Sequence, residues 1–90
     1  MIVHVNNISG IAHQLMADGK PCNRYIAIVR VSEFGIAGRR EWFIRIVGPS
    51  VSAVEKKLVQ YETNEQIDVP ESDLYDKTGV KYGATRNTFS

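Results

Sequence analysis

The stretch IVRVSEFGIAGRREWFIRIV, residues 28–47, decides the fold of this chain. Two apolar runs flank the segment Gly35-Ile36-Ala37-Gly38, and their Val, Ile and aromatic residues favour β-strands. The spacing predicts an antiparallel hairpin of strands 24–34 and 41–47. A four-residue loop pairs Val31 with Trp42, whereas a two-residue turn at Ala37-Gly38 pairs Val31 with Ile44.

Both registers place the same residues on each face of the hairpin, because side chains alternate along a strand. The face predicted to join the core carries Tyr25, Ala27, Val29, Val31, Trp42, Ile44 and Ile46. The second face carries Ile26, Ile28, Arg30, Phe34, Phe43, Arg45 and Val47. Two arginines are therefore expected on one face, which an antiparallel sheet can leave in water. Trp42 is assigned to packing, and its indole N–H needs a hydrogen-bond partner.

The N-terminal segment supports two interpretations. Residues 2–5 suit a short strand, and the apolar residues Ile8, Ile11, Leu15 and Met16 then follow at helical spacing. Helix propensity favours a helix over residues 8–18. The competing interpretation makes Asp18-Gly19 a hairpin turn between two strands.

The second half of the chain begins after Gly48-Pro49 with an amphipathic helix. Its apolar face consists of Val51, Val54, Leu58 and Tyr61, and Ser50 or Ser52 can cap its N-terminus. We predict a short closing strand over residues 66–69 and a short turn of helix in the segment ESDLYDK, residues 71–77.

This element order predicts a ferredoxin-like βαββαβ sandwich, an α+β fold with an antiparallel sheet and two helices on one face. Residues 1–69 would form the single domain, and residues 70–90 a peripheral C-terminal arm that packs on it or extends from it. A small all-β barrel with one helix is the alternative, if residues 8–18 form a strand.

Composition and charge limit the functional classes to which the chain can belong. The chain is 43% hydrophobic and 23% charged with a net charge of +1, so no global charge attracts it to nucleic acid or to a membrane. It contains one cysteine, no signal-peptide pattern and no apolar run long enough to span a bilayer. We therefore expect a soluble, cytoplasmic protein. An acidic segment, residues 61–76, contains six Asp or Glu residues and no Lys or Arg.

No known catalytic motif is present. The sequence has neither a phosphate-binding loop nor a dinucleotide fingerprint. The potential soft metal ligands are His4, His13 and Cys22, whose spacing is not diagnostic of zinc. A nucleophilic pair of Cys22 and His13 stays open, because it depends on their distance in the fold. We predict a non-enzyme without metal or cofactor.

The second face of the hairpin is the predicted binding surface. Its candidate residues are Phe34, Phe43, Arg30 and Arg45, together with Arg39 and Arg40 near the turn. Arginine beside aromatic and aliphatic residues is typical of protein interfaces. The expected partner is a protein with an acidic and apolar patch, or a second copy of the chain. The chain would then be an inhibitor or adaptor that occupies a site on another macromolecule, such as a phage-type antagonist of a host factor.

Two further interpretations of this face remain. It could bind single-stranded nucleic acid through ring stacking and cationic contacts to phosphates. However, residues 2–8 and 38–46 lack the aromatic signatures of an RNA-recognition motif. It could also be covered by the chain's own acidic residues 62–76.

Overall fold

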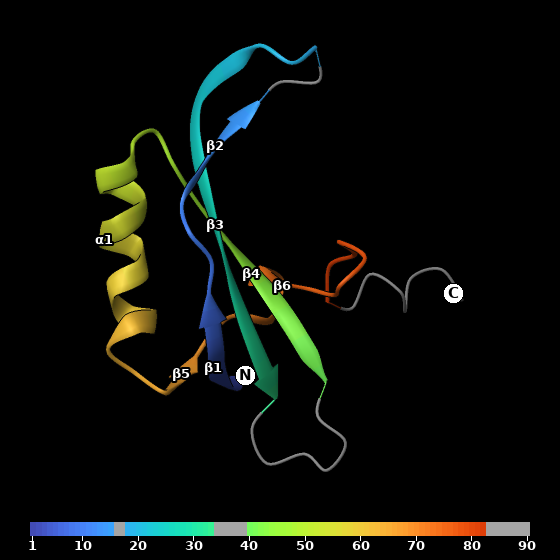
Figure 1. Cartoon of the computed structure of the whole chain (residues 1–90). Coiled ribbons are helices and arrows are strands. Elements are labelled where there is room, and N and C mark those ends of the chain that lie inside the picture. Colours follow the sequence, from blue (N-terminus) through green and yellow to red (C-terminus); the bar gives the residue numbers. More distant parts are fainter. Residues whose placement is uncertain (16–17, 34–39, 83–90) are drawn as a thin grey trace.

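The computed structural model describes residues 1–15, 18–33 and 40–82. Within them, six antiparallel strands form one sheet, and one α-helix packs on one side of it (Figure 1). The elements are β1 (Ile2–Ile8), β2 (Ala12–Leu15), β3 (Pro21–Glu33), β4 (Glu41–Gly48), α1 (Val51–Glu62), β5 (Gln66–Asp68), a 3-10 helix (Glu71–Asp73) and β6 (Leu74–Tyr75).

The long strand β3 organises the sheet, whose strand order is β5-β1-β3-β4-β6. The C-terminal half of β3 lies between β1 and β4, and its N-terminal half pairs with β2. Val31 pairs with Trp42, which confirms the register of a four-residue loop. The ladder continues past the last strand pair, because the Glu33 N–H donates to the Arg40 carbonyl oxygen at 3.2 Å.

The ferredoxin-like prediction is wrong, because the segment predicted as the first helix contains strand β2 instead. β2 pairs with β3 from Ala12–Ile26 to Leu15–Pro21, and Gly19 takes a positive φ of 83° between them. This is the competing hairpin interpretation. Among the described strands, the order also runs from β5 to β6 with no pairing between these two, so the sheet is open and differs from the alternative barrel.

A tertiary requirement explains why propensity failed there. β3 extends beyond the last pairs that it makes with β1, at Val29, and with β4, at Tyr25. Along the edge that β1 leaves, β2 pairs with the backbone of β3 from Pro21 to Ile26. Helix propensities differ by only about 0.7 kcal/mol per residue between ordinary residues. A few such differences do not outweigh a ladder of backbone hydrogen bonds.

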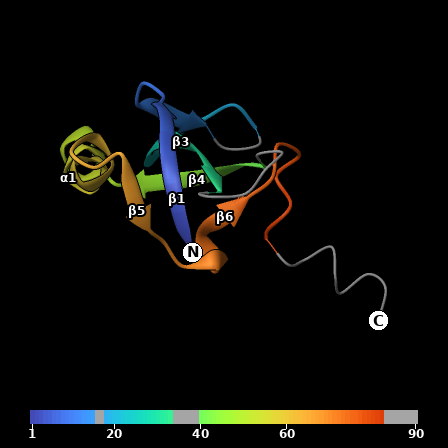
Figure 2. The ribbon, with the colours of Figure 1, turned by 90° about the horizontal axis from the view of Figure 1, so that it is seen from below.

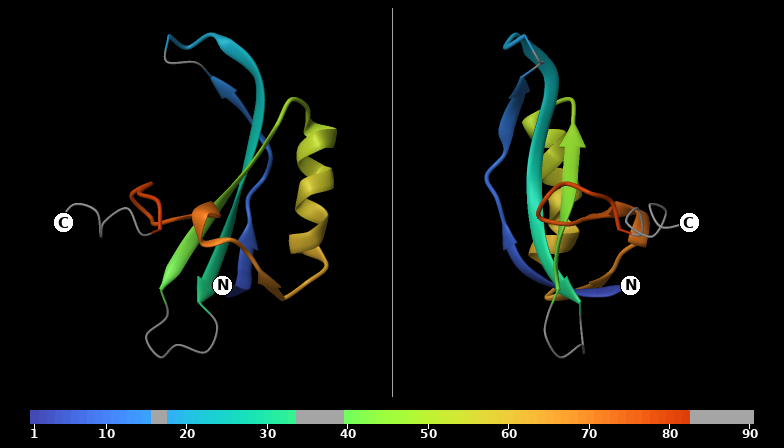
Figure 3. Two further views of the ribbon diagram at one scale, coloured as in Figure 1. Left: turned by 180° about the vertical axis from the view of Figure 1, so that it is seen from behind. Right: turned by 90° about the vertical axis from the view of Figure 1, so that its right-hand side faces the viewer.

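Ser9 forms hydrogen bonds with β3 in the gap between β1 and β2. Its N–H donates to the Ile28 carbonyl oxygen at 2.9 Å, and its hydroxyl oxygen accepts from the Ile28 N–H at 2.8 Å. A side-chain oxygen thus replaces a strand carbonyl at the point where the chain leaves regular β pairing. β1 and β2 consequently act as one interrupted strand along β3 (Figure 3).

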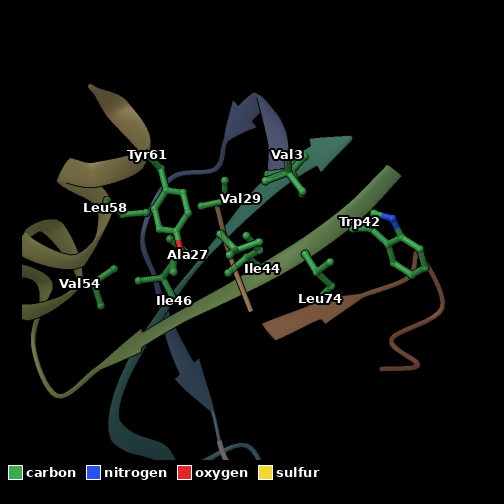
Figure 4. Close-up of a cluster of buried hydrophobic side chains, with 12 residues drawn as sticks. Val3, Ala27, Val29, Trp42, Ile44, Ile46, Val54, Leu58, Tyr61 and Leu74 are labelled. Carbon is green, nitrogen blue, oxygen red and sulfur yellow. The ribbon is translucent and has the colours of Figure 1, made fainter. Parts of the chain in front are cut away.

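The core lies between the sheet and α1, as Figure 4 shows. The helix contributes Val54, Leu58 and Tyr61, which pack with the apolar residues of β3 and β4. Ser50, not Ser52, is the N-cap, because the Ser50 side chain accepts from the Ala53 N–H at 3.1 Å. Val51 belongs to the predicted apolar stripe but is 45% exposed, so the buried face of α1 begins one turn later.

The face predicted to join the core does so. Ala27, Val29, Val31, Trp42, Ile44 and Ile46 are all buried, and Tyr25 is partly buried. The Trp42 indole N–H donates to the Glu33 carboxylate at 3.0 Å, which provides the expected partner.

The segment after β5 continues into the same core. The predicted turn of helix is the 3-10 helix, and Leu74 of β6 is completely buried beside Ile44 of β4. Residues 74–82 then form a small hairpin, in which Tyr75 pairs with Lys81 and the Tyr82 N–H donates to the Leu74 carbonyl oxygen. The Tyr82 ring packs edge-on against Trp42, with centroids 4.9 Å apart.

Candidate partner-binding face

The face of β3 and β4 that points away from α1 carries the predicted binding residues. We call it the outer face and define it by Ile26, Ile28, Arg30, Phe43, Arg45 and Val47. Arg30 pairs directly with Phe43, and Ile28 pairs directly with Arg45. Both arginines are exposed and the apolar residues are half-buried. The prediction that the two arginines share one face is confirmed.

Arg30 contacts a carboxylate on the neighbouring strand. Its Nε lies 3.3 Å from Oε2 of Glu41, and the two side chains are 48% and 52% exposed. An ion pair this exposed contributes little to stability, because water screens it and two long side chains must be ordered. Arg30 therefore remains accessible to a partner.

Arg45 is held by the C-terminal hairpin. Its guanidinium carbon lies 4.1 Å from the centre of the Tyr75 ring, in a cation–π contact. On the hairpin turn, Gly79 has a positive φ of 86°, and a Cβ there would lie 3.3 Å from Nη2 of Arg45. Glycine thus permits both the turn conformation and the close approach of backbone to guanidinium.

Asp76 fixes the turn beside Arg45. One carboxylate oxygen accepts from the Thr78 N–H at 2.8 Å, the Thr78 hydroxyl at 2.6 Å and the Val80 N–H at 3.0 Å. The hydrogen bond from the Thr78 hydroxyl, followed by that from the Val80 N–H, lowers the pKa of Asp76. Asp76 is therefore ionised at neutral pH, and its carboxylate accepts hydrogen bonds within its own turn.

These contacts enclose a shallow hollow of about 230 Å³ on the outer face. It is lined by Ile28, Phe43, Arg45, Tyr75, Asp76, Lys77 and Gly79. β3 and β4 supply its floor, and the hairpin supplies one wall. Figure 2 shows α1 and this hairpin on opposite sides of the β3–β4 pair. The outer face thus combines a floor of two paired strands, a guanidinium held by an aromatic ring and an opening to solvent.

The remaining predicted residues lie elsewhere. Phe34 and Arg39 fall outside the described residues. Arg40 is exposed immediately before β4 and does not line the hollow. Among the residues that the structure describes, no ion pair joins Arg30 or Arg45 to the acidic segment. Cover by the chain itself is partial and consists of hairpin contacts to Arg45.

Sequence reasoning missed the wall of the hollow, namely Tyr75, Lys77 and Gly79. The segment Asp76-Lys77-Thr78-Gly79 carries a turn signal, because an acceptor side chain precedes a glycine. That signal predicts a hairpin, but it does not reveal which strand the hairpin meets.

His13 and Cys22 lie close together without forming a nucleophilic pair. The His13 ring Nε2 contacts the Cys22 carbonyl oxygen, while the Cys22 thiol lies 3.1 Å from the Gln14 carbonyl oxygen. In residues 1–15, 18–33 and 40–82, no three His, Cys, Asp or Glu side chains gather closely enough to hold a metal ion. The same ranges contain no helix with the length and apolar character needed to cross a bilayer.

Comparisons with protein-family models, curated proteins and solved structures found no match to this chain. The chemistry of the outer face is therefore the main indication of what the chain does.

Proposed function

We propose that this chain is a small, non-catalytic protein-binding module whose docking surface is the outer face. It would act as an inhibitor or adaptor by occupying a site on another macromolecule. The observation that carries the proposal is the composition of this face. Two exposed arginines alternate with half-buried Ile28 and Phe43 on a surface that α1 leaves open.

This combination suits protein recognition physically. Interface cores are enriched in aromatic residues and arginine, and a few such residues provide most of the binding energy. β3 and β4 pair continuously from Tyr25–Gly48 to Ser32–Glu41, so the docking surface is already ordered. A preformed surface loses little conformational entropy when a partner binds.

Single-stranded nucleic acid fits the same face less well. Glu41 lies beside Arg30, and Asp76 lies in the hollow with Arg45. Affinity for a polyanion grows with the number of phosphates neutralised, and these carboxylates oppose it. Phe43 is also half-buried, which limits the area on which a base could stack.

The test is affinity capture from cells that encode the chain, with partners identified by mass spectrometry. The baits are the wild type, Arg30→Glu, Arg45→Glu and the control Lys56→Glu, which reverses an exposed charge on α1. We expect one partner to be retained by wild type and Lys56→Glu and lost by both arginine variants. Light scattering of each bait reports self-association, and a thymidine decamer titrated at two salt concentrations reports nucleic-acid binding.

Urea unfolding of each bait shows whether the fold survives the charge reversal. Retention of the partner by both folded arginine variants would exclude the outer face as the docking surface. Tight decamer binding that weakens steeply with salt would favour the nucleic-acid function instead.

A further inference from the structure

We propose that the hollow beside Arg45 is a receptor for one carboxylate with an apolar neighbour, presented by an Asp or Glu side chain of the protein partner. This inference rests on the proposed function and specifies the chemistry of the partner. It is carried by the arrangement of Arg45, Tyr75, Ile28 and Phe43 around one opening.

The guanidinium of Arg45 is positioned but not neutralised. The guanidinium carbon lies over the Tyr75 ring, 4.1 Å from its centre, in a cation–π contact that holds the group beside the hollow. In the described part of the chain, no carboxylate forms an ion pair with Arg45. A carboxylate can accept two parallel hydrogen bonds from such a group, which gives both affinity and direction.

The apolar floor of the hollow determines which partner side chain can lie next to the bound carboxylate. Ile28 lies directly opposite Arg45 on β3, and Phe43 lies on the same face of β4. Both are half-buried, so an apolar partner side chain can remove their remaining surface from water. An acidic residue next to an aliphatic or aromatic one matches this pair of features.

The charge of the lining favours a single carboxylate over a phosphate chain. Arg45 and Lys77 contribute two positive charges, and Asp76 contributes one negative charge. One carboxylate therefore balances the excess charge of the hollow. A second nearby negative charge would meet Asp76, whose ionised form is held by Thr78 and Val80.

The donors present also favour a side-chain carboxylate over a chain terminus. Terminal carboxylates are commonly captured by a nest of free backbone N–H groups. In this wall, the N–H groups of Thr78, Gly79 and Val80 already donate to Asp76. With these three N–H groups occupied, the main donors toward a ligand are the side chains of Arg45 and Lys77, so an internal acidic residue is the committed occupant.

The experiment titrates capped peptides into the ¹⁵N-labelled full chain and follows its NMR signals. The probes are acetyl-Gly-Ser-Gly-Glu-Leu-Gly-Ser-amide and two matched peptides, one with Gln for Glu and one with Ser for Leu. Capping removes both terminal charges, so the Glu side chain is the carboxylate present. We expect the Glu-Leu peptide to shift the Arg45 Nε–H and the Lys77 and Gly79 amide signals, with about tenfold weaker binding of the Gln-Leu peptide.

Variants of the chain test the role of the guanidinium. Arg45→Gln should bind the Glu-Leu and Gln-Leu peptides equally, and Arg45→Lys should lose most of the preference because lysine lacks the planar donor fork. The control Lys56→Gln should keep the full preference. A free-acid peptide, acetyl-Gly-Ser-Gly-Ser-Leu, provides only a terminal carboxylate and should bind about as weakly as the Gln-Leu peptide.

The inference is overturned if Arg45→Gln keeps the preference for Glu, or if none of the peptides moves the Arg45 signal. It is also overturned if the free-acid peptide or a thymidine decamer binds more tightly than the Glu-Leu peptide. The proposed function is judged separately by partner capture. Capture that both charge reversals abolish but Arg45→Gln leaves intact would reject the carboxylate receptor and leave the docking face standing.

Discussion

The two faces of the β3–β4 pair are built from alternate residues of the same strands, yet they differ in chemistry. On one face, Val29 and Ile44 are buried under α1. On the other, the neighbouring residues Arg30 and Arg45 are exposed. Because side chains alternate along a strand, one backbone can hold a core on one side and present a binding surface on the other.

The two faces differ in burial because different elements pack on them. α1 and Leu74 fill the core face, whereas hairpin residues 75–79 approach the outer face at the hollow. The core face should therefore determine stability, and the outer face should determine binding. Substitutions on adjacent residues can test this separation.

The largest effect is expected for Val29→Asp compared with Arg30→Asp. Val29 is completely buried, so an aspartate there would place an unpaired charge in the core. We expect Val29→Asp to lose more than about 4 kcal/mol of stability, and Arg30→Asp to stay within about 1 kcal/mol of wild type. Urea unfolding followed by circular dichroism measures both. Equal losses at the two positions would show that the faces are not separated.

A smaller loss is expected for Leu74→Ala, which tests whether the residues after β5 belong to the core. Leu74 has no exposed surface, so its truncation leaves a cavity beside Ile44. The expected loss is about 2–5 kcal/mol by urea unfolding. Val80→Ala is the matched control in the same hairpin, because Val80 is exposed. If Leu74→Ala were as stable as Val80→Ala, the segment after β5 would not belong to the core.

The helix that packs on the core face, α1, can be destabilised at its N-terminus. Ser50→Ala removes the hydrogen bond to the Ala53 N–H and should cost about 1 kcal/mol. Ser52→Ala should cost less, because Ser50 provides the cap. Thermal unfolding of the two variants separates these assignments. Peptide binding by Ser50→Ala should be unchanged below its melting temperature, since the residues that line the hollow come from β3, β4 and the hairpin and not from α1.

The smallest effect concerns the hairpin wall at low pH. The folded-state pKa of Asp76 lies below its unfolded value, so its stabilising effect is complete above that unfolded pKa. It is lost as the pH falls through the folded pKa, below about 4. We expect the amide signals of Thr78 and Val80 to move in this range, and Asp76→Asn to abolish the movement. A movement centred at or above the pH at which an aspartate in a short unstructured peptide titrates would contradict the assignment.

Much of the fold follows from local pattern. Period-two alternation identified the core residues of β3 and β4, and loop length gave the pairing of Val31 with Trp42. Residues 12–15 were harder, since the same apolar residues suit a helix in isolation. Their strand form depends on the unpaired half of β3, which is a tertiary requirement.

The candidate site was predictable only in part. Arg30, Phe43 and Arg45 follow from alternation, because they lie in one hairpin. Tyr75 and Gly79 approach Arg45 from a distant part of the chain, so no local periodicity predicts their contact. Few large apolar residues occur there, and the segment is anchored by the buried Leu74 and by the Tyr82 ring, which packs against Trp42.

The separation of the two faces can be tested most directly by thiol labelling. The variants Val29→Cys, Arg30→Cys and Val31→Cys are made in a Cys22→Ser background and exposed to a maleimide under native conditions. We expect position 30 to react as fast as an unfolded control, and positions 29 and 31 to react only as the chain unfolds. Equal labelling rates at all three positions would contradict the alternation from which both the core and the binding face follow.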